Sequence, residues 1–198
     1  MFLLPPADSP ATANLFQSDL DERGYVMNLS RVWAWRPEVQ SGFAALRTLL
    51  TGASALSKRE LGVLVCATAS SLGDSYCSLA WGKLLADAAD PASAAAVLQG
   101  VAGPGLTARD QALSVWARKV TGNPNATTRD DVDALRAAGF TEREIFEATT
   151  FIGFRLAFST INAALGARPD WQVAAAAPPE VQQAVAYGRP VAERAASA

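Results

Sequence analysis

The residues best suited to chemistry lie close together between positions 74 and 81. Cys77 follows Asp74 by three residues and precedes Trp81 by four, so a helix starting after Gly73 would carry Cys77 in its first turn and Trp81 on the same face. The helix dipole favours a thiolate there by about 0.3–1 kcal/mol, whereas the Asp74 carboxylate opposes it. We therefore expect a mainly protonated, slowly reacting Cys77 at neutral pH. A small buried packing residue is the competing interpretation.

The chain contains no histidine, and this excludes several kinds of catalytic site. Histidine is the commonest general base near neutral pH and the commonest metal ligand. Ser-His-Asp catalysis, Cys-His catalysis and His-containing zinc sites within this chain are therefore excluded, and its two cysteines alone cannot form a four-cysteine zinc site. We expect no metal and no cofactor, while a site built only of carboxylates stays open.

Three residues each have a structural and a functional interpretation. Asp74 fits the N-cap position of the helix, where a carboxylate accepts backbone N–H bonds, or it serves as a general base or substrate anchor. Trp81 either packs in the core or forms a stacking wall for a ligand. Arg155 stands in the apolar run 151–161. If it is buried it needs a partner, either an acid across an interface or a bound anion.

Capping signals mark the helices that would position these residues. Ser57 with Glu60, and Thr141 with Glu144, form capping boxes ahead of apolar runs. No alternation of period two appears, so we expect an all-α protein. The expected helices span 8–22, 26–35, 37–51, 58–72, 75–88, 91–100, 108–121, 129–138, 142–165 and 179–194.

Composition limits the partners and the organisation of the chain. The net charge is −2 and no basic cluster stands out, so nucleic acid is not an expected partner. No apolar stretch approaches the ~20 residues that cross a bilayer. The start of the chain lacks the basic region of a signal peptide, so we expect a cytoplasmic protein with Cys66 and Cys77 as unpaired thiols. We expect residues 1–173 to form one domain and the Ala/Pro-rich residues 174–198 to form a loosely attached tail.

Three segments follow one another in an informative order. The first contains GYVMNLSR and then RPE over 24–38, the second runs from SKREL to ATAS and GDSYCSLAW over 57–81, and the third is DVDALRAAGFTEREI over 131–145. Together they resemble the alkylhydroperoxidase D-like (AhpD-like, carboxymuconolactone decarboxylase) family, in its peroxidase-related branch. This resemblance implies an all-α, AhpD-like helical bundle that assembles as a homodimer or a higher homo-oligomer.

The resemblance also implies a thiol relay, of which the chain keeps little. The family motif is C-x-x-C-x-x-x-H with a Glu one helix upstream, which together supply an attacking thiolate, a resolving thiol and proton transfer. The matching positions here are Asp74, Cys77 and Trp81, with Gly62 at the Glu position twelve residues before Asp74. Only Cys77 keeps the residue that the family has, so the motif is degenerate.

These observations lead to three hypotheses about function. We expect an AhpD-like protein that has lost most of the thiol peroxidase relay and acts as a non-catalytic oligomeric or ligand-binding protein, with a small molecule as its ligand. The alternative is a one-cysteine thiol peroxidase, an antioxidant oxidoreductase in which Cys77 works with an external reductant. A lactone decarboxylase-type activity also needs no C-x-x-C pair, but the absence of histidine counts against it.

Overall fold

The computed structural model of the chain describes residues 1–194, which form eleven α-helices, one short 3-10 helix and no strand. The α-helices are α1 (Pro10–Arg23), α2 (Asn28–Trp33), α3 (Pro37–Gly52), α4 (Lys58–Ser71), α5 (Ser75–Ala88), α6 (Pro91–Gln99), α7 (Ala108–Gly122), α8 (Arg129–Ala137), α9 (Glu142–Ala164), α10 (Trp171–Ala176) and α11 (Pro179–Ala184), and the 3-10 helix η1 spans Pro124–Ala126. The all-α prediction is confirmed, and the first nine expected helices have ends within two residues of the observed ones. None of the helices in residues 1–194 combines the length and the hydropathy that a bilayer-spanning helix needs.

Side-chain caps start the helices that carry the site. The Ser57 hydroxyl accepts from the Glu60 amide while the Glu60 carboxylate accepts from the Ser57 amide, and Thr141 with Glu144 forms the same pair of bonds at α9. At α5 the cap is Asp74, whose carboxylate accepts from the backbone of the first turn. Each cap satisfies amides that have no partner inside the helix and contributes about 1 kcal/mol. Local sequence therefore determines where α4, α5 and α9 begin.

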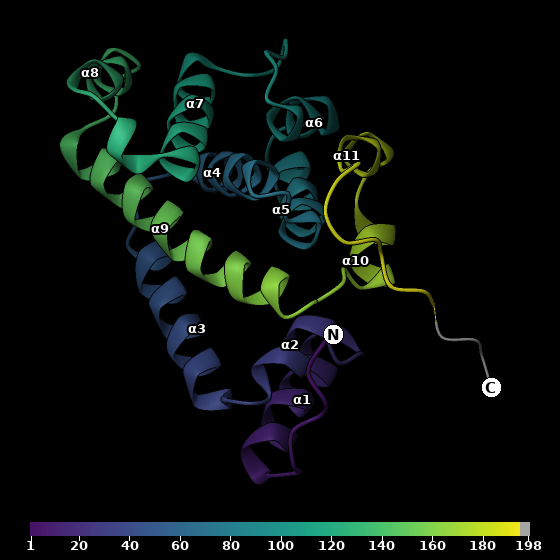
Figure 1. Cartoon of the computed structure of the whole chain (residues 1–198). Helices are drawn as coiled ribbons and strands as arrows, with labels where there is room; N and C mark the ends of the chain where they lie inside the picture. Colours follow the sequence, from purple (N-terminus) through teal and green to yellow (C-terminus); the bar gives the residue numbers. More distant parts are fainter. Residues whose placement is uncertain (195–198) are drawn as a thin grey trace.

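The long helix α9 crosses the molecule between two groups of helices, with α1 to α3 on one side and α4 to α8 on the other (Figure 1). On the second side α4 is the central helix, and every residue from Glu60 to Ala69 in it is buried. It packs against α5, α6, α7 and α9. Gly62 permits the close approach of α4 to α5, because an added Cβ would lie 3.2 Å from the Cβ of Leu85.

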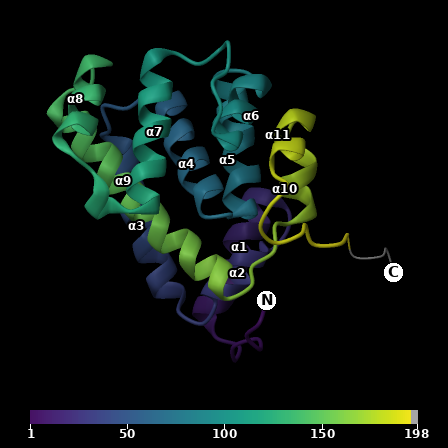
Figure 2. The same ribbon diagram turned by 45° about the horizontal axis from the view of Figure 1, so that its top comes forward.

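The C-terminal segment packs against α5 and α6, whereas we expected a loosely attached tail (Figure 2). Val181 of α11 is fully buried, and a Cβ added at Gly82 of α5 would lie only 2.5 Å from its Cγ1 atom. Beyond α11, the Ser75 hydroxyl donates to the carbonyl of Arg189 at 2.7 Å. The helix expected over 179–194 ends at Ala184. The Ala/Pro-rich composition resembles that of a linker, but small apolar side chains also fit closely into a helix–helix groove.

Candidate functional site

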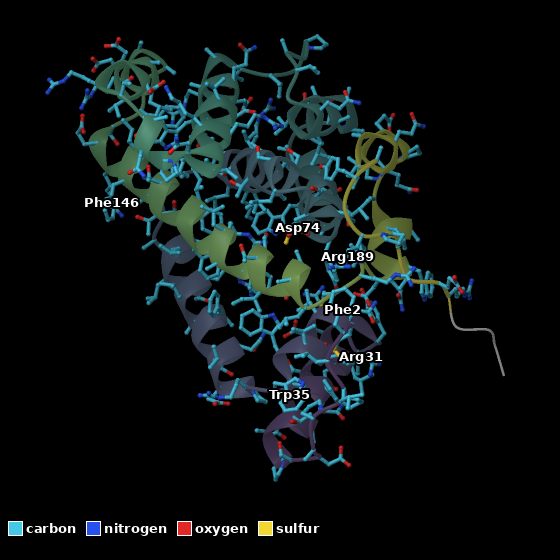
Figure 3. All side chains as sticks on the ribbon, viewed as in Figure 1. Phe2, Arg31, Trp35, Asp74, Phe146 and Arg189 are labelled. Carbon is cyan, nitrogen blue, oxygen red and sulfur yellow. The ribbon has the colours of Figure 1, made fainter. Side chains whose placement is uncertain are left out.

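The site begins at the junction of α4 and α5. Gly73 has a φ of 67°, in the left-handed region that favours glycine, and turns the chain between the two helices. Asp74 follows, and its Oδ1 atom accepts from the Cys77 amide at 3.0 Å. The Asp74 side chain lies inside the molecule, where α5 begins (Figure 3). The capping interpretation of Asp74 is therefore confirmed.

Cys77 contacts Arg155, which belongs to α9. The Arg155 Nη2 atom donates to Cys77 Sγ at 2.8 Å, and Ser159 Oγ lies 3.7 Å from the same sulfur. Arg155 and Ser159 are four residues apart, so they share one face of α9. Cys77 and Arg155 are each only 4% exposed. The contact joins positions 78 residues apart, and no local pattern in the sequence indicates it.

The environment of Cys77 keeps its thiol protonated at neutral pH. Burial raises the pKa of the Cys77 thiol to about 12, because the ionised form loses its hydration. The Arg155 guanidinium lowers the pKa, and the negative charge of Asp74 raises it further. The sequence suggested a slow thiol from the contest between helix dipole and Asp74. The structure adds burial, and burial is the largest effect.

Aromatic rings surround the Arg155 guanidinium. Its Cζ atom lies 5.0 Å from the ring centroid of Phe158 and 5.5 Å from that of Trp81. Such distances give a cation an attractive interaction with the ring. Further ring contacts extend this group into what we call the aromatic cluster, which consists of Trp33, Phe43, Trp81, Phe151, Phe154 and Phe158. Trp81 packs edge-on against Phe151, so it is part of the packed interior as well as a neighbour of Arg155.

Cys77, Trp81 and Arg155 line one cleft of about 680 Å³. Its walls come from α1, α2, α3, α5, α9 and α10, so both groups of helices contribute to it. Asp74 does not line the cleft, although it caps the helix that presents Cys77. Gly62 lies outside the cleft as well. It packs against Leu85, eight residues beyond Cys77 on α5, which is about 12 Å along a helix.

Two polar atoms of the site are buried without a hydrogen-bond partner among the described residues. They are Arg155 Nε and Asp74 Oδ2. Within residues 1–194 no carboxylate oxygen lies within 4.0 Å of the Arg155 guanidinium. A buried donor left unpaired costs about 1–3 kcal/mol, and more when it is charged. Arg155 therefore keeps hydrogen-bonding capacity that residues 1–194 do not use.

Sequence reasoning missed a second polar pair beside the cleft. The Tyr76 hydroxyl donates to Asp170 Oδ2, and Asp170 Oδ1 also accepts from the Asn28 amide at 3.0 Å. Tyr76 lines the cleft next to Cys77. Burial raises the pKa of Tyr76 above its ordinary value, and the negative charge of Asp170 adds to the rise. The pair joins positions 94 residues apart, so it ties the start of α5 to the segment after α9.

Comparisons with known proteins identify the fold. No protein-family model and no curated protein matches the chain. Among solved structures, an uncharacterized peroxidase-related protein from Silicibacter sp. TM1040 is 24% identical, with a TM-score of 0.76 over 87% of this chain and 93% of that chain. An uncharacterized peroxidase-related protein from Ralstonia eutropha JMP134, described as an alkylhydroperoxidase AhpD core, is 23% identical, with a TM-score of 0.77 over 87% of this chain and 94% of that chain.

A third similar structure is an enzyme. The debrominase Bmp8 is 13% identical, with a TM-score of 0.68 over 92% of this chain and 94% of that chain. A variant of Bmp8 with a cysteine changed to alanine, in complex with 2,3,4-tribromopyrrole, gives a TM-score of 0.69 at the same identity, over 92% of this chain and 95% of that chain. The likeness is one of fold, and it agrees with the resemblance carried by the sequence segments. The chain therefore has the all-helical fold of the AhpD-like, peroxidase-related proteins.

Proposed function

We propose that this chain binds a small molecule with a planar apolar body in the cleft beside Cys77 and does not run the two-thiol peroxidase relay of its AhpD-like relatives. The observation that carries this proposal is the cleft itself. It is large enough for a drug-sized ligand, it reaches a buried guanidinium, and rings of the aromatic cluster line it. Apolar walls with a few placed polar groups are typical of ligand sites.

The thiols argue against the relay. The first cysteine of the family motif would stand three residues before Cys77. Asp74 occupies that position here and caps the helix. The other cysteine, Cys66, is fully buried in α4, does not line the cleft and forms no disulfide. Burial raises the pKa of Cys66 as well. The two-thiol relay needs a second cysteine to resolve the sulfenic acid, and Cys66, the other cysteine of the chain, is not paired with Cys77.

The similar debrominase structure adds support of a different kind. Its complex contains 2,3,4-tribromopyrrole, a small planar ring compound. A related all-helical scaffold thus holds a ligand of the size and shape that the cleft would admit. The specific argument for this chain comes from its own aromatic cluster.

A pair of variants tests the binding proposal. Calorimetry would measure binding of three two-ring probes, 2-naphthoate, 2-naphthamide and 2-naphthol. We expect at least one to bind the unmodified chain, and Ala80→Phe, which adds a ring to the cleft wall, to abolish that binding. Ala157→Phe is the matched control, since it adds the same ring at an exposed position of α9 outside the cleft. Binding that survives in Ala80→Phe, or no binding below about 1 mM, would contradict the proposal.

The one-cysteine thiol peroxidase remains the second candidate, because one observation favours it. A guanidinium 2.8 Å from the sulfur stabilises a thiolate. In that reaction the Cys77 thiolate attacks the distal oxygen of ROOH and forms a sulfenic acid, while the O–O bond breaks and the alkoxide leaves as ROH after taking up a proton. Two external thiols then reduce the sulfenic acid to the thiol, which gives their disulfide and water. Peroxide consumption with dithiothreitol, compared between the unmodified chain and Cys77→Ser, tests this. We expect no Cys77-dependent turnover.

Alkylation of Cys77 against pH gives an independent measure. Because burial raises the pKa of Cys77 to about 12, the alkylation rate should climb about tenfold per pH unit from pH 7 to 10 without a plateau. Cys66→Ala leaves a single thiol to follow. A plateau near pH 7, together with peroxide turnover, would replace the binding proposal with the one-cysteine peroxidase.

A further inference from the structure

We infer that the ligand of the cleft is an aromatic monoanion whose charged group pairs with Arg155. This inference rests on the proposed function, the binding of a planar small molecule, and assigns the chemical class of that molecule. It follows from the charge of Arg155, from the surroundings of its guanidinium and from the charges around the cleft mouth.

The first step is the unbalanced charge of Arg155. Arginine carries a positive charge, and Arg155 is only 4% exposed. An isolated buried charge is costly unless it is paired. In residues 1–194 the Arg155 side chain donates one hydrogen bond, to the sulfur of Cys77. The thiol is protonated at neutral pH, so it does not neutralise the charge. An anion from outside the chain would.

The second step is geometric. The Arg155 Nε atom has no partner, while the Nη2 atom is engaged with Cys77. Arg155 is one of the residues that line the cleft, so a ligand there would lie against its side chain. Carboxylates bind a guanidinium through two parallel N–H···O bonds, which is the strongest pairing that arginine makes. The free donor capacity of Arg155 therefore suits a carboxylate or a similar planar anion.

The third step concerns the body of the ligand. Phe158 and Trp81 flank the guanidinium, and Phe43 of α3 faces the same cleft. Aromatic rings prefer offset-stacked or edge-to-face partners and gain more from such pairs than the area they bury accounts for. A ring attached directly to the anionic group would lie among these side chains. An aliphatic acid of equal size would not gain those ring contacts.

The net charge of the cleft lining also favours an anionic ligand. Its lining has four cationic side chains and two acidic ones, and one of the cations, Lys83, is paired with Asp87. An excess of one positive charge remains, although the whole chain carries a net charge of −2. A cleft whose sign opposes that of the molecule concentrates anions near its mouth. Arg23 and Arg47 are the other cations of the lining.

Two probes of the same shape test the inference. Calorimetry would compare 2-naphthoate with 2-naphthamide, which differ in charge and share the ring. We expect the anion to bind about tenfold more tightly or better, as for a hydrogen bond to a charged group. In Arg155→Met that preference should vanish. In Arg31→Met, which removes an exposed arginine outside the cleft, it should persist.

The outcomes separate this inference from the proposed function. Equal binding of amide and anion by the unmodified chain would overturn the monoanion and leave ring binding in place. Absence of binding for both, and for 2-naphthol, would overturn the proposed function. A preference that survives in Arg155→Met would also overturn the inference. The comparison in the unmodified chain is decisive even if Arg155→Met does not fold.

Discussion

Two regions of the molecule use arginine in opposite ways. At the starts of α4, α7 and α9, a group that we call the capping-box cluster contains the capping residues and the arginines that bind them, namely Ser57, Arg59, Glu60, Thr107, Arg109, Asp110, Thr141 and Glu144. There Arg109 contacts Glu60 and Glu144, each at 2.7 Å, and Arg59 contacts Asp110 at 2.7 Å. In the cleft, Arg155 is more deeply buried and contacts no carboxylate of the described residues.

The difference is between a cluster whose charges are paired within the fold and a cleft where we propose that a ligand binds. Each acid of the capping-box cluster caps one helix and pairs with an arginine of another, so the cluster joins three helix starts and leaves little for a ligand. Arg155 brings a charge inside without a matching acid, a cost that stability alone does not explain. Departures from local rules of this kind are expected at functional sites. The four predictions below test the contrast, from the largest expected effect to the smallest.

Deleting residues 174–198 should cause the largest loss of stability, by about 4 kcal/mol or more, because it uncovers apolar surface on α5 and α6. Val181 is fully buried, and Ala177 and Ala184 are nearly so. The deletion would remove Ala176 from the lining of the cleft and would leave all residues of the capping-box cluster in place. Urea unfolding measures the change, with truncation after Glu193 as the control. Unchanged stability of residues 1–173 would instead support a domain boundary after residue 173.

Arg109→Met should destabilise the chain by about 3 kcal/mol, since it leaves two partly buried carboxylates without their partner. Arg109 also lies 3.7 Å over the ring of Phe140, a contact that methionine keeps only in part. Urea unfolding at pH 7 provides the measurement. Arg31→Met serves as the reference for loss of an exposed positive charge. A change below about 0.5 kcal/mol would mean that the cluster contributes no more than a surface ion pair.

Low pH should reduce folding stability through the capping-box cluster, and high pH should reduce it through the cleft. Burial alone would raise the pKa of Asp110, but bonds from Arg59 and Thr107 hold it below its ordinary value, and Glu144 behaves likewise. Their contribution is present above the unfolded pKa of about 4 and is lost as pH falls through the folded pKa. Cys77 has a raised pKa of about 12. Its contribution is present below the unfolded pKa of about 8.5 and is lost as pH rises from there toward 12.

Urea unfolding of the unmodified chain from pH 3 to 11 would show both effects. We expect Arg109→Met to reduce the part of the acid loss that comes from Glu144. Cys77→Ser should reduce the alkaline loss, to which the raised pKa values of Cys66 and Tyr76 also contribute. The acid loss should be smaller than that of Arg109→Met, because protonation removes charge while the helices stay capped by Ser57, Thr107 and Thr141. An alkaline loss of stability that is the same in Cys77→Ser would show that burial of Cys77 does not contribute to it.

Arg155→Met should change stability least, and in the opposite direction to Arg109→Met. Replacing a buried, unpaired guanidinium with an apolar side chain of similar length removes its desolvation cost, so we expect stability to stay level or rise by about 1 kcal/mol. The measurement is the same urea titration without added ligand. A loss of more than about 2 kcal/mol would show that Arg155 has a structural role and would end the contrast with Arg109.

Local signals predicted the helices and one part of the site. A serine or threonine with an acid three residues later marks a helix start within four residues of sequence, and Ser57 and Thr141 do so here. Asp74 is also a local signal, because a cap needs only its own first turn. These features depend on neighbours in sequence, which the sequence displays directly.

The cleft depends on distant contacts that the sequence does not display. An arginine in an apolar run indicated that Arg155 needs a partner, but nothing indicated that Cys77 would lie beside it. The pairing of Tyr76 with Asp170 gave no signal either. Composition did not indicate how the C-terminal segment packs, because composition describes average behaviour, whereas the fit of Val181 over Gly82 depends on the shape of one groove.

Helix α3 is the part of the cleft wall that we expect to open most easily. It contributes Phe43 and Arg47 to the lining, yet none of its residues is buried. Segments with little buried area open at low free-energy cost while the rest of a protein stays folded. Amide hydrogen exchange in α3 should therefore be fast in the isolated chain, and ligand entry should follow that local opening. The homo-oligomer stays a prediction from the family resemblance, and exchange in α3 that slows as protein concentration rises would support it.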